Sequence, residues 1–166
     1  MPKIKKFDKT DPIPPETAAQ IANLFEQNYP PMHPNERKIE ECAERANQEA
    51  LNALLDQGRV IFTAHDVHEK IQGLLEMREA DAGDGVYMLL VWIIVDALAQ
   101  NQGVSSALHA AFEQEAKQRA AKISKPSCLL LGVHPENSAK QVYEHWGYVE
   151  DGRTTEDGTI FMFKDF

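Results

Sequence analysis

The sequence predicts one mixed α/β domain, in which an antiparallel meander of strands leads into a strand–helix–strand unit and a final hairpin. Three observations predict it. A chain of 166 residues with 43% hydrophobic content can bury one core and is too short for two, so a single domain is expected over residues 1–166. Strand-like and helix-like patterns alternate along the chain. The residues from Val86 to Val95 are all hydrophobic and end at a polar turn that opens an amphipathic helix.

The N-terminal third is expected to hold one strand and two helices. Lys3 to Phe7 alternates weakly, as a first strand would. A cluster of prolines ending at Pro15 leads into a helix with one apolar face, and Pro30 follows its end. A second, longer helix is predicted from Asn35, which would serve as its N-cap, to Gly58.

The middle of the chain is expected to form the meander. Arg59 to His65 and Ile71 to Glu79 read as two strands joined by a polar turn, and the loop 81–85 turns the second of them into the apolar run Val86 to Val95. A helix from Gly103 to about Ala121 then returns the chain to a strand over Cys128 to Val133. Because strands on either side of a crossover helix usually run parallel, this strand is the expected parallel neighbour of the apolar run.

The C-terminal part is expected to add a helix and a hairpin. The helix covers Ser138 to Trp146 and closes at Gly147. The hairpin pairs Tyr148 to Thr154 with Thr159 to Phe163. The apolar terminal strand offers an edge with which a second subunit could pair, so a homodimer is one open alternative to a monomer.

Composition excludes several classes of protein. The formal net charge is −9 and Lys and Arg do not cluster, so no nucleic-acid partner is expected. An acidic surface suits a cationic substrate, although solubility alone is the more common reason for it. No apolar run reaches the roughly 18 to 20 residues that span a bilayer, so no membrane partner is expected.

The chain is expected to be cytoplasmic. The first residues, Met1 to Lys6, lack the hydrophobic stretch of a signal peptide. Cys42 and Cys128 have apolar neighbours, which fits buried free thiols in a reducing compartment. His65 and His68 lie in one turn without a further spaced ligand, so no metal site is predicted.

The turn after Val95 is the most informative segment of the sequence. A strand there feeds directly into a helix whose apolar residues repeat at helical spacing from Val104 onward. The first backbone N–H groups of a helix have no internal partner and carry the positive end of its dipole. The segment is therefore a candidate binding site for a phosphate group.

Two blocks of residues resemble one known family. The segment Gln100-Asn101-Gln102-Gly103-Val104-Ser105 is similar to the acetyl-CoA loop Q/R-x-x-G-x-G/A of the GNAT superfamily of N-acetyltransferases, with Ser105 in place of the second Gly or Ala. Downstream, a strand ends in a loop carrying Asn137, followed by a helix that carries Tyr143 and closes with Gly and an aromatic residue, as in the family's other block. The family's usual Asn position falls on Glu136, so Asn137 comes one residue late.

The resemblance implies the acyl-CoA N-acyltransferase fold of this family. That fold is a twisted, mixed and mostly antiparallel sheet of about six to seven strands with about four helices. Its central parallel strands, here ending at Val95 and His134, splay apart and take the pantetheine arm of acetyl-CoA. The implied cofactor contacts are the main chain of Ile93, Ile94 and Val95, the pyrophosphate loop, and two residues of the second block. These last two groups comprise Gln100, Asn101, Gln102, Gly103, Val104, Ser105, Ser106, Asn137 and Tyr143.

The implied reaction is direct transfer of an acetyl group from acetyl-CoA, as co-substrate, to a primary amine of a small molecule or peptide. Tyr143 matches the family tyrosine that protonates the departing CoA thiolate. The general base stays open between Glu76, His134, Glu136 and a chain of waters. His33 lies in a region that shapes the acceptor site in this family. A module of the same fold that binds acyl-CoA as a sensor or scaffold, without turnover, is the alternative function.

Overall fold

The computed structural model describes all residues from Met1 to Phe166. Its strands are β1 (Lys3–Phe7), β2 (Val60–His65), β3 (Ile71–Asp81), β4 (Val86–Val95), β5 (Ser127–Val133), β6 (Val149–Thr154) and β7 (Ile160–Asp165). Its helices are α1 (Pro15–Gln27), α2 (Asn35–Ala43), α3 (Gln48–Asp56), α4 (Val104–Ala120) and α5 (Ala139–His145), with a short 3₁₀ helix, η1 (Ala97–Ala99). None of the helices has both the length and the apolar composition needed to cross a bilayer.

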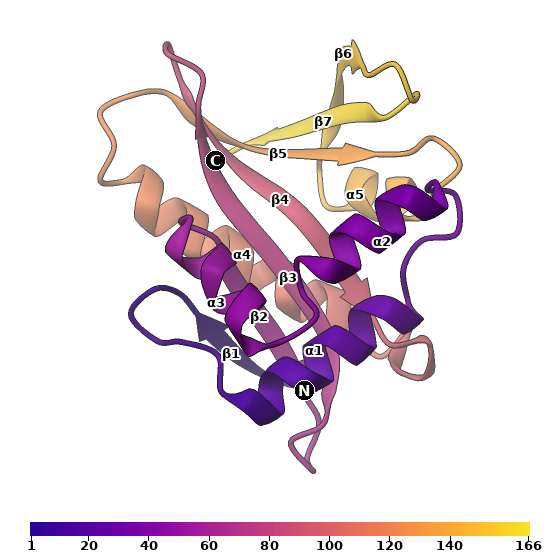
Figure 1. Ribbon diagram of the computed structural model, residues 1–166. Helices are drawn as coiled ribbons and strands as arrows, with labels where there is room; N and C mark the ends of the chain where they lie inside the picture. Colours follow the sequence, from indigo (N-terminus) through magenta and orange to yellow (C-terminus); the bar gives the residue numbers. More distant parts are fainter.

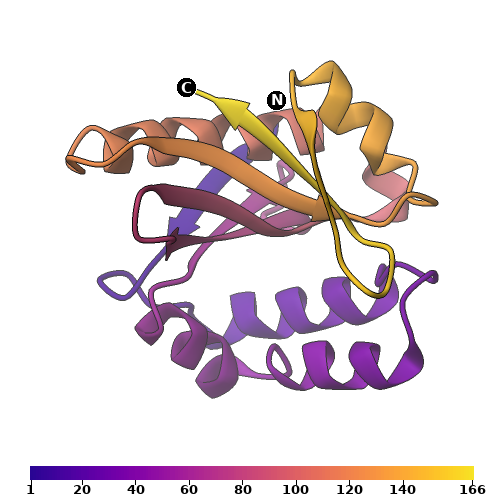
Figure 2. The same ribbon diagram turned by 90° about the horizontal axis from the view of Figure 1, so that it is seen from above.

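One open sheet carries all seven strands, in the order β1-β2-β3-β4-β5-β7-β6. Helices α1, α2 and α3 cover one face, and α4 and α5 cover the other (Figures 1 and 2). The β4–β5 pair is parallel and every other pair is antiparallel. The predicted fold class, a mixed and mostly antiparallel sheet with a central parallel pair, is therefore confirmed, with five α-helices instead of about four.

The extra helix comes from a break in the predicted helix Asn35–Gly58, which is wrong as a single element. The chain leaves helical geometry after α2, and α3 starts afresh at an N-cap, Asn47, whose side chain accepts a hydrogen bond from the Ala50 N–H at 2.9 Å. Between the two helices the side chain of Arg45 turns into the protein and is 1% exposed. Helix α2 buries no residue, and Ile39 on it is 69% exposed. Apolar spacing over this stretch therefore overstated the buried face.

The terminal strand does not form a free edge, so the predicted edge for a second subunit is wrong. Strand β7 lies between β5 and β6, with Met162 opposite Leu131 of β5 and opposite Glu150 of β6. The physical reason is the composition of the hairpin. The sequence of β7 is apolar and gains from neighbours on both sides, whereas the polar sequence of β6, VEDGRT, tolerates the solvent at the edge.

The sheet separates two apolar clusters. One lies against α4 and includes Leu75, Met88 and Leu108. The other lies against α1 and α3 and includes Phe25 and Leu51. Most of the hydrophobic burial that stabilises the fold belongs to these two layers.

A β-bulge in β4 exchanges its two faces. Glu76 on β3 pairs with Trp92, but the next residue, Met77, pairs with Leu90, so Val91 is the extra residue. Before the bulge, the even-numbered residues such as Leu90 face the α4 cluster; after it, Trp92 and Ile94 face the α1 cluster. Without the bulge, strict alternation would have put Leu90, Trp92 and Ile94 on the same face of the sheet.

Both cysteines are unpaired, but they are half-buried rather than buried. Cys42 lies on α2 and Cys128 on β5. Their partial burial raises the pKa of each thiol above its ordinary value. Both thiols are therefore mainly protonated near neutral pH.

Candidate functional site

The candidate site lies where the two central strands separate. The parallel pairing of β4 with β5 runs from Val86 opposite Ser127 to Leu90 opposite Leu131 and stops there. Strand β4 continues to Val95 without a partner on that side. Two adjoining cavities follow the gap, and Asn137 lines both of them. We call them the loop cavity, beside the turn between β4 and α4, and the inner cavity, between the strands.

The loop cavity measures about 560 Å³ and is built by the turn that enters α4. Two residues of this turn have left-handed backbone conformations, Asn101 with φ of 61° and Gly103 with φ of 79°. No side chain caps α4, and the first hydrogen bond closing its N-terminal turn runs from the Ala107 N–H to the Gly103 carbonyl. The N–H groups at the start of α4 are therefore available to an anion.

Most of the predicted cofactor residues meet at these cavities. The loop cavity collects Val95, Gln100, Asn101, Gly103, Val104, Ser105, Ser106 and Asn137. Ile93, Asn137 and Tyr143 line the inner cavity. Two predicted residues line neither: Ile94 is buried in the α1 cluster, because the bulge turns it to that face, and the side-chain amide of Gln102 donates to the Leu98 carbonyl at 3.0 Å.

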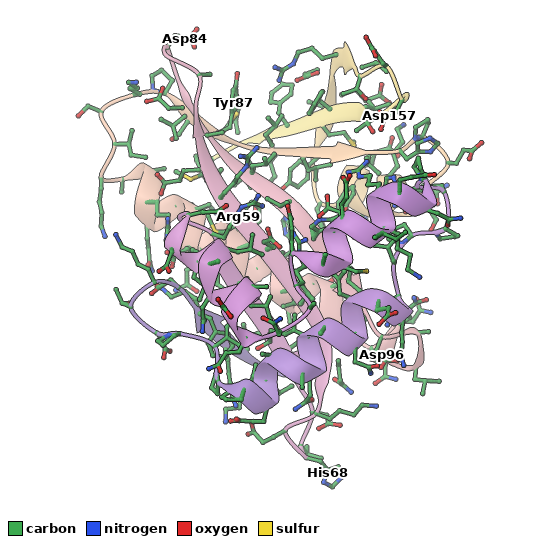
Figure 3. The ribbon with its side chains drawn as sticks, viewed as in Figure 1. Arg59, His68, Asp84, Tyr87, Asp96 and Asp157 are labelled. Carbon is green, nitrogen blue, oxygen red and sulfur yellow. The ribbon has the colours of Figure 1, made fainter.

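The inner cavity is small, with about 70 Å³ of room, and lies at the bulge of β4. Its walls come from five parts of the chain. These are the bulge around Val91, the end of β5 at His134, Tyr143 of α5, Thr159 of the β6–β7 turn, and His33 with Arg37 from the α1–α2 connection and the start of α2. Figure 3 shows Asp157 of the β6–β7 turn beside the N-terminal end of α2, and its carboxylate lies 3.6 Å from Arg37. The helices of one face and the C-terminal hairpin thus close over the gap together.

Tyr143 is a buried phenol at the inner cavity. Its side chain is 6% exposed and lines the inner cavity. Burial raises the pKa of its phenol well above the ordinary value of 10, with no hydrogen bond contributing to the shift. The hydroxyl is therefore protonated at any physiological pH and free to donate to a group in the cavity.

The structure puts two imidazoles face to edge across the cavity. The ring centroids of His33 and His134 lie 6.4 Å apart, with an interplanar angle of 82°. Burial lowers the pKa of His33, and the nearby guanidinium of Arg37 and the ring of His134 lower it further. His33 is therefore neutral at pH 7. The sequence singled out His134 by its place at a strand end, whereas the pairing with His33 joins residues 101 positions apart.

Glu76, the second predicted base, lies outside both cavities. Its side chain is fully buried on β3. Arg45 donates to one carboxylate oxygen from Nε at 3.0 Å and from Nη2 at 2.8 Å, and Arg59 donates to the other oxygen at 2.5 Å. The head group of Arg59 reaches over the sheet beside α3 (Figure 3). Sequence reasoning missed this cluster, because nothing in the spacing of Arg45 and Arg59 pointed to Glu76.

A second buried cluster supports the helix that carries Tyr143. His109 of α4 stacks on Trp146 with a centroid distance of 4.1 Å and shares a 3.0 Å hydrogen bond with the Tyr148 hydroxyl. The ring of Tyr143 packs against both aromatic residues, at 5.8 Å from Trp146 and 6.2 Å from Tyr148. Burial lowers the pKa of His109 from 6.5 to about 4.

This shift predicts a loss of stability in mild acid. The folded protein keeps His109 neutral, whereas the unfolded chain binds a proton below about pH 6.5, so the contribution is complete above pH 6.5 and is lost as the pH falls toward 4. We expect His109 to account for about 1 kcal/mol of the free energy of unfolding per pH unit in this window. Urea unfolding at pH 7 and pH 5 measures it. The His109→Gln variant should show the flatter profile, and equal slopes in the two proteins would contradict the prediction.

Comparison with known proteins agrees with this geometry. The family model described as "Acetyltransferase (GNAT) domain" matches residues 31–164. No curated protein sequence matches the chain. Among solved structures, the PaiA N-acetyltransferase from Thermoplasma acidophilum in complex with coenzyme A is 13% identical, with a TM-score of 0.70 over 100% of this chain and 99% of the other.

An aminoglycoside 6'-N-acetyltransferase complexed with coenzyme A is similar as well. It is 16% identical, with a TM-score of 0.69 over 98% of this chain and 96% of the other. At such identities the two structures establish a shared fold. The family model, which matches residues 31–164 of 166, agrees with them independently. This protein belongs to the GNAT acetyltransferase family.

Proposed function

We propose that the protein is an N-acetyltransferase that moves the acetyl group of acetyl-CoA to a primary amine. The observation that carries the proposal is that the two cavities are adjacent and share Asn137 in their walls. An uncapped helix N-terminus opens into the loop cavity, and Asn137 connects that cavity to the one lined by Tyr143. A diphosphate ester bound at the first would extend its thioester toward the second. Two neighbours of the same fold are recorded with coenzyme A, which supports this ligand.

In this proposal the pyrophosphate binds the backbone N–H groups of the turn Gln100–Ser106 and the start of α4. Ser105, the departure from the family's glycine or alanine, lines the loop cavity and adds a hydroxyl donor. The pantetheine arm runs along β4 beyond Leu90, where the backbone has no β5 partner, and its amides pair with the main chain of Ile93 to Val95 as an added strand would.

The chemistry needs few protein groups. The neutral amine nitrogen attacks the thioester carbonyl carbon, the carbon–sulfur bond breaks, and coenzyme A leaves as a thiolate. Tyr143 donates its phenolic proton to the sulfur and is reprotonated from solvent. The amine loses one proton to water. Of the predicted bases Glu76, His134 and Glu136, only His134 lines the inner cavity, and its Nδ1 already accepts the backbone N–H of Glu136. We propose a structural role for Glu76.

Turnover separates this function from the alternative, a module that binds acyl-CoA without catalysis. Release of free coenzyme A from acetyl-CoA is followed with a panel of primary amines, and binding of coenzyme A is measured by calorimetry. We expect micromolar binding and amine-dependent release. Binding at that strength with no amine raising release above background would favour the non-catalytic module.

Gly103→Val tests the phosphate site. A Cβ atom at Gly103 would meet no protein atom within 4 Å, so a side chain there enters the open space of the loop cavity. We expect a 10- to 100-fold weaker affinity for coenzyme A, equal to about 1.4 to 2.7 kcal/mol. Calorimetric titration of coenzyme A into each variant provides the measurement.

Gly83→Val is the matched control. Gly83 lies in the turn between β3 and β4, has φ of 88°, and likewise has no atom within 4 Å of an added Cβ. Because both positions have left-handed φ, both variants should lose similar stability. Only Gly103→Val should lose affinity, and an unchanged affinity in that variant would refute the loop as the phosphate site.

A further inference from the structure

The inner cavity is lined by polar side chains but by no carboxylate. Its polar side chains include His33, Arg37, His134, Asn137 and Tyr143, and no aspartate or glutamate lines it. Arg37 is the only one of these five with a permanent charge. The chain as a whole carries a net charge of −9, yet neither the inner cavity nor the loop cavity is lined by a carboxylate.

Hydrogen bonding determines which nitrogen of His33 carries the proton. Arg37 Nη1 lies 3.4 Å from His33 Nδ1, and a guanidinium can only donate. Nδ1 of His33 is therefore the acceptor, and in the neutral ring the proton lies on Nε2. Because burial and Arg37 keep this ring neutral, its remaining capacity at the cavity is that of a donor.

His134 and Asn137, like His33, each use an acceptor atom in a hydrogen bond within the protein. The backbone N–H of Glu136 donates to His134 Nδ1 at 3.3 Å, which leaves the proton of the neutral ring on Nε2. The side-chain oxygen of Asn137 accepts from the Ala139 N–H at 2.9 Å, which leaves its NH₂ group. Both side chains have thus used an acceptor atom within the protein and keep donors.

Arg37 also keeps donors. Its nearest carboxylates lie beyond hydrogen-bond distance, with Asp157 at 3.6 Å and Glu41 at 3.9 Å. Asp157 is held by its own turn, where it accepts from the Thr159 N–H at 3.1 Å. By contrast, Arg45 is bound to carboxylates at 2.8 to 3.0 Å. The guanidinium of Arg37 lies over Trp92, 5.9 Å from the ring centroid, and its ion pairs with Asp157 and Glu41 leave its Nη2 without a hydrogen-bond partner.

We propose that the acceptor is an amine that carries a carboxylate, as an amino acid does, and that Arg37 and His33 bind this carboxylate. The proposal rests on the N-acetyltransferase function above and names its substrate class. A carboxylate is an acceptor-only group that pairs with a guanidinium through two parallel hydrogen bonds. A polycationic amine would need carboxylates around it, and the cavity has none. With both imidazoles as donors, the proton of the acceptor's ammonium group leaves to water.

Matched ligands test the proposal on the protein saturated with coenzyme A, so that binding is measured without turnover. Each L-amino acid of a panel (alanine, leucine, phenylalanine, lysine, glutamate) is compared by calorimetry with its own amide, and spermidine serves as the polycation. The amide keeps the side chain and the amine and removes only the negative charge. We expect the best-bound amino acid to bind at least tenfold more tightly than its amide and than spermidine.

Two variants test whether the preference for the amino acid over its amide depends on Arg37. Arg37→Gln should bring the amino acid and the amide to equal affinity while the affinity for coenzyme A stays unchanged. Lys38→Gln removes the same charge from the next position of α2, which does not line the cavity, and should keep the tenfold preference.

The outcomes separate the two claims. Equal binding of acid and amide, tighter binding of spermidine, no binding by any ligand of the panel, or a preference that survives Arg37→Gln would each overturn the carboxylate site. A preference for the acid without coenzyme A release in the presence of acetyl-CoA would uphold the carboxylate site and contradict the transferase. Rapid acetylation of spermidine alone would uphold the transferase and contradict the carboxylate site.

Discussion

Replacing Tyr143 with phenylalanine is expected to lower kcat by about 100-fold or more, within the range of 10² to 10⁴ typical of a positioned general acid. The phenol is buried with its pKa raised by desolvation, so it is protonated throughout the working pH range. Phenylalanine keeps the ring that packs on Trp146 and Tyr148 and removes only the donor. The thiolate would then have to leave without a proton from the protein. Steady-state kinetics with acetyl-CoA and the best acceptor provide the measurement.

Tyr148→Phe is the matched control for this variant. Tyr148 is 2% exposed and belongs to the same aromatic cluster, but its hydroxyl is bonded to His109 and does not line the inner cavity. We expect Tyr148→Phe to lose about 1 kcal/mol of stability and to keep kcat. Tyr143→Phe should show the opposite pattern, with an unfolding midpoint close to the wild type. Equal kcat values in wild type and Tyr143→Phe would remove the tyrosine from the mechanism.

Replacing Glu76 with alanine is expected to cost about 3 to 5 kcal/mol of unfolding free energy, the largest stability effect predicted for this chain. The carboxylate is fully buried and binds Arg45 and Arg59. Arg45 is itself 1% exposed, so removing Glu76 leaves a buried guanidinium with only Glu41 and Glu44 as ionic partners. Urea unfolding measures the effect.

Glu79→Ala is the comparison, because Glu79 lies on the same strand and also pairs with an arginine, Arg119, at 2.9 Å. Its side chain is 40% exposed, and an exposed pair contributes about 1 kcal/mol or less. Glu76→Gln adds a second readout, since it keeps the shape of the side chain and removes its charge. A variant with wild-type stability but strongly reduced kcat would make Glu76 a catalytic group and contradict the structural role.

The site illustrates which residues could be predicted from the chain alone. The turn around Gly103 was found because its signals are local: an apolar run, a polar turn and a helix with free N–H groups are all read within a few residues. Tyr143 was singled out because a second local block resembles a motif of the GNAT family. His33 was noted only as a candidate and Arg37 was not found, because they reach the inner cavity through the packing of α2 over the sheet.

The fold divides in the same way. Strand and helix order followed from periodicity, whereas the bulge at Val91, the break between α2 and α3, and the insertion of β7 beside β5 did not. Each of these depends on a partner far along the chain. The bulge exists only relative to β3, and the turn of Arg45 into the protein is stabilised by a carboxylate 31 residues away. The spacing of apolar residues indicates which residues of one helix or strand share a face. It does not indicate which distant segment packs against that face.

By itself, the sequence determined the order of the elements and the strand–turn–helix segment at Gly103 that is proposed to bind an anion, since backbone hydrogen bonding and apolar periodicity act over a few residues. The tertiary structure alone decided which side chains surround the inner cavity. It pairs Glu76 with Arg45 and brings His33 opposite His134. It also leaves Arg37 with free donors at the inner cavity. These are contacts between distant segments, and their geometry exists only after the two layers of the core have packed against the sheet.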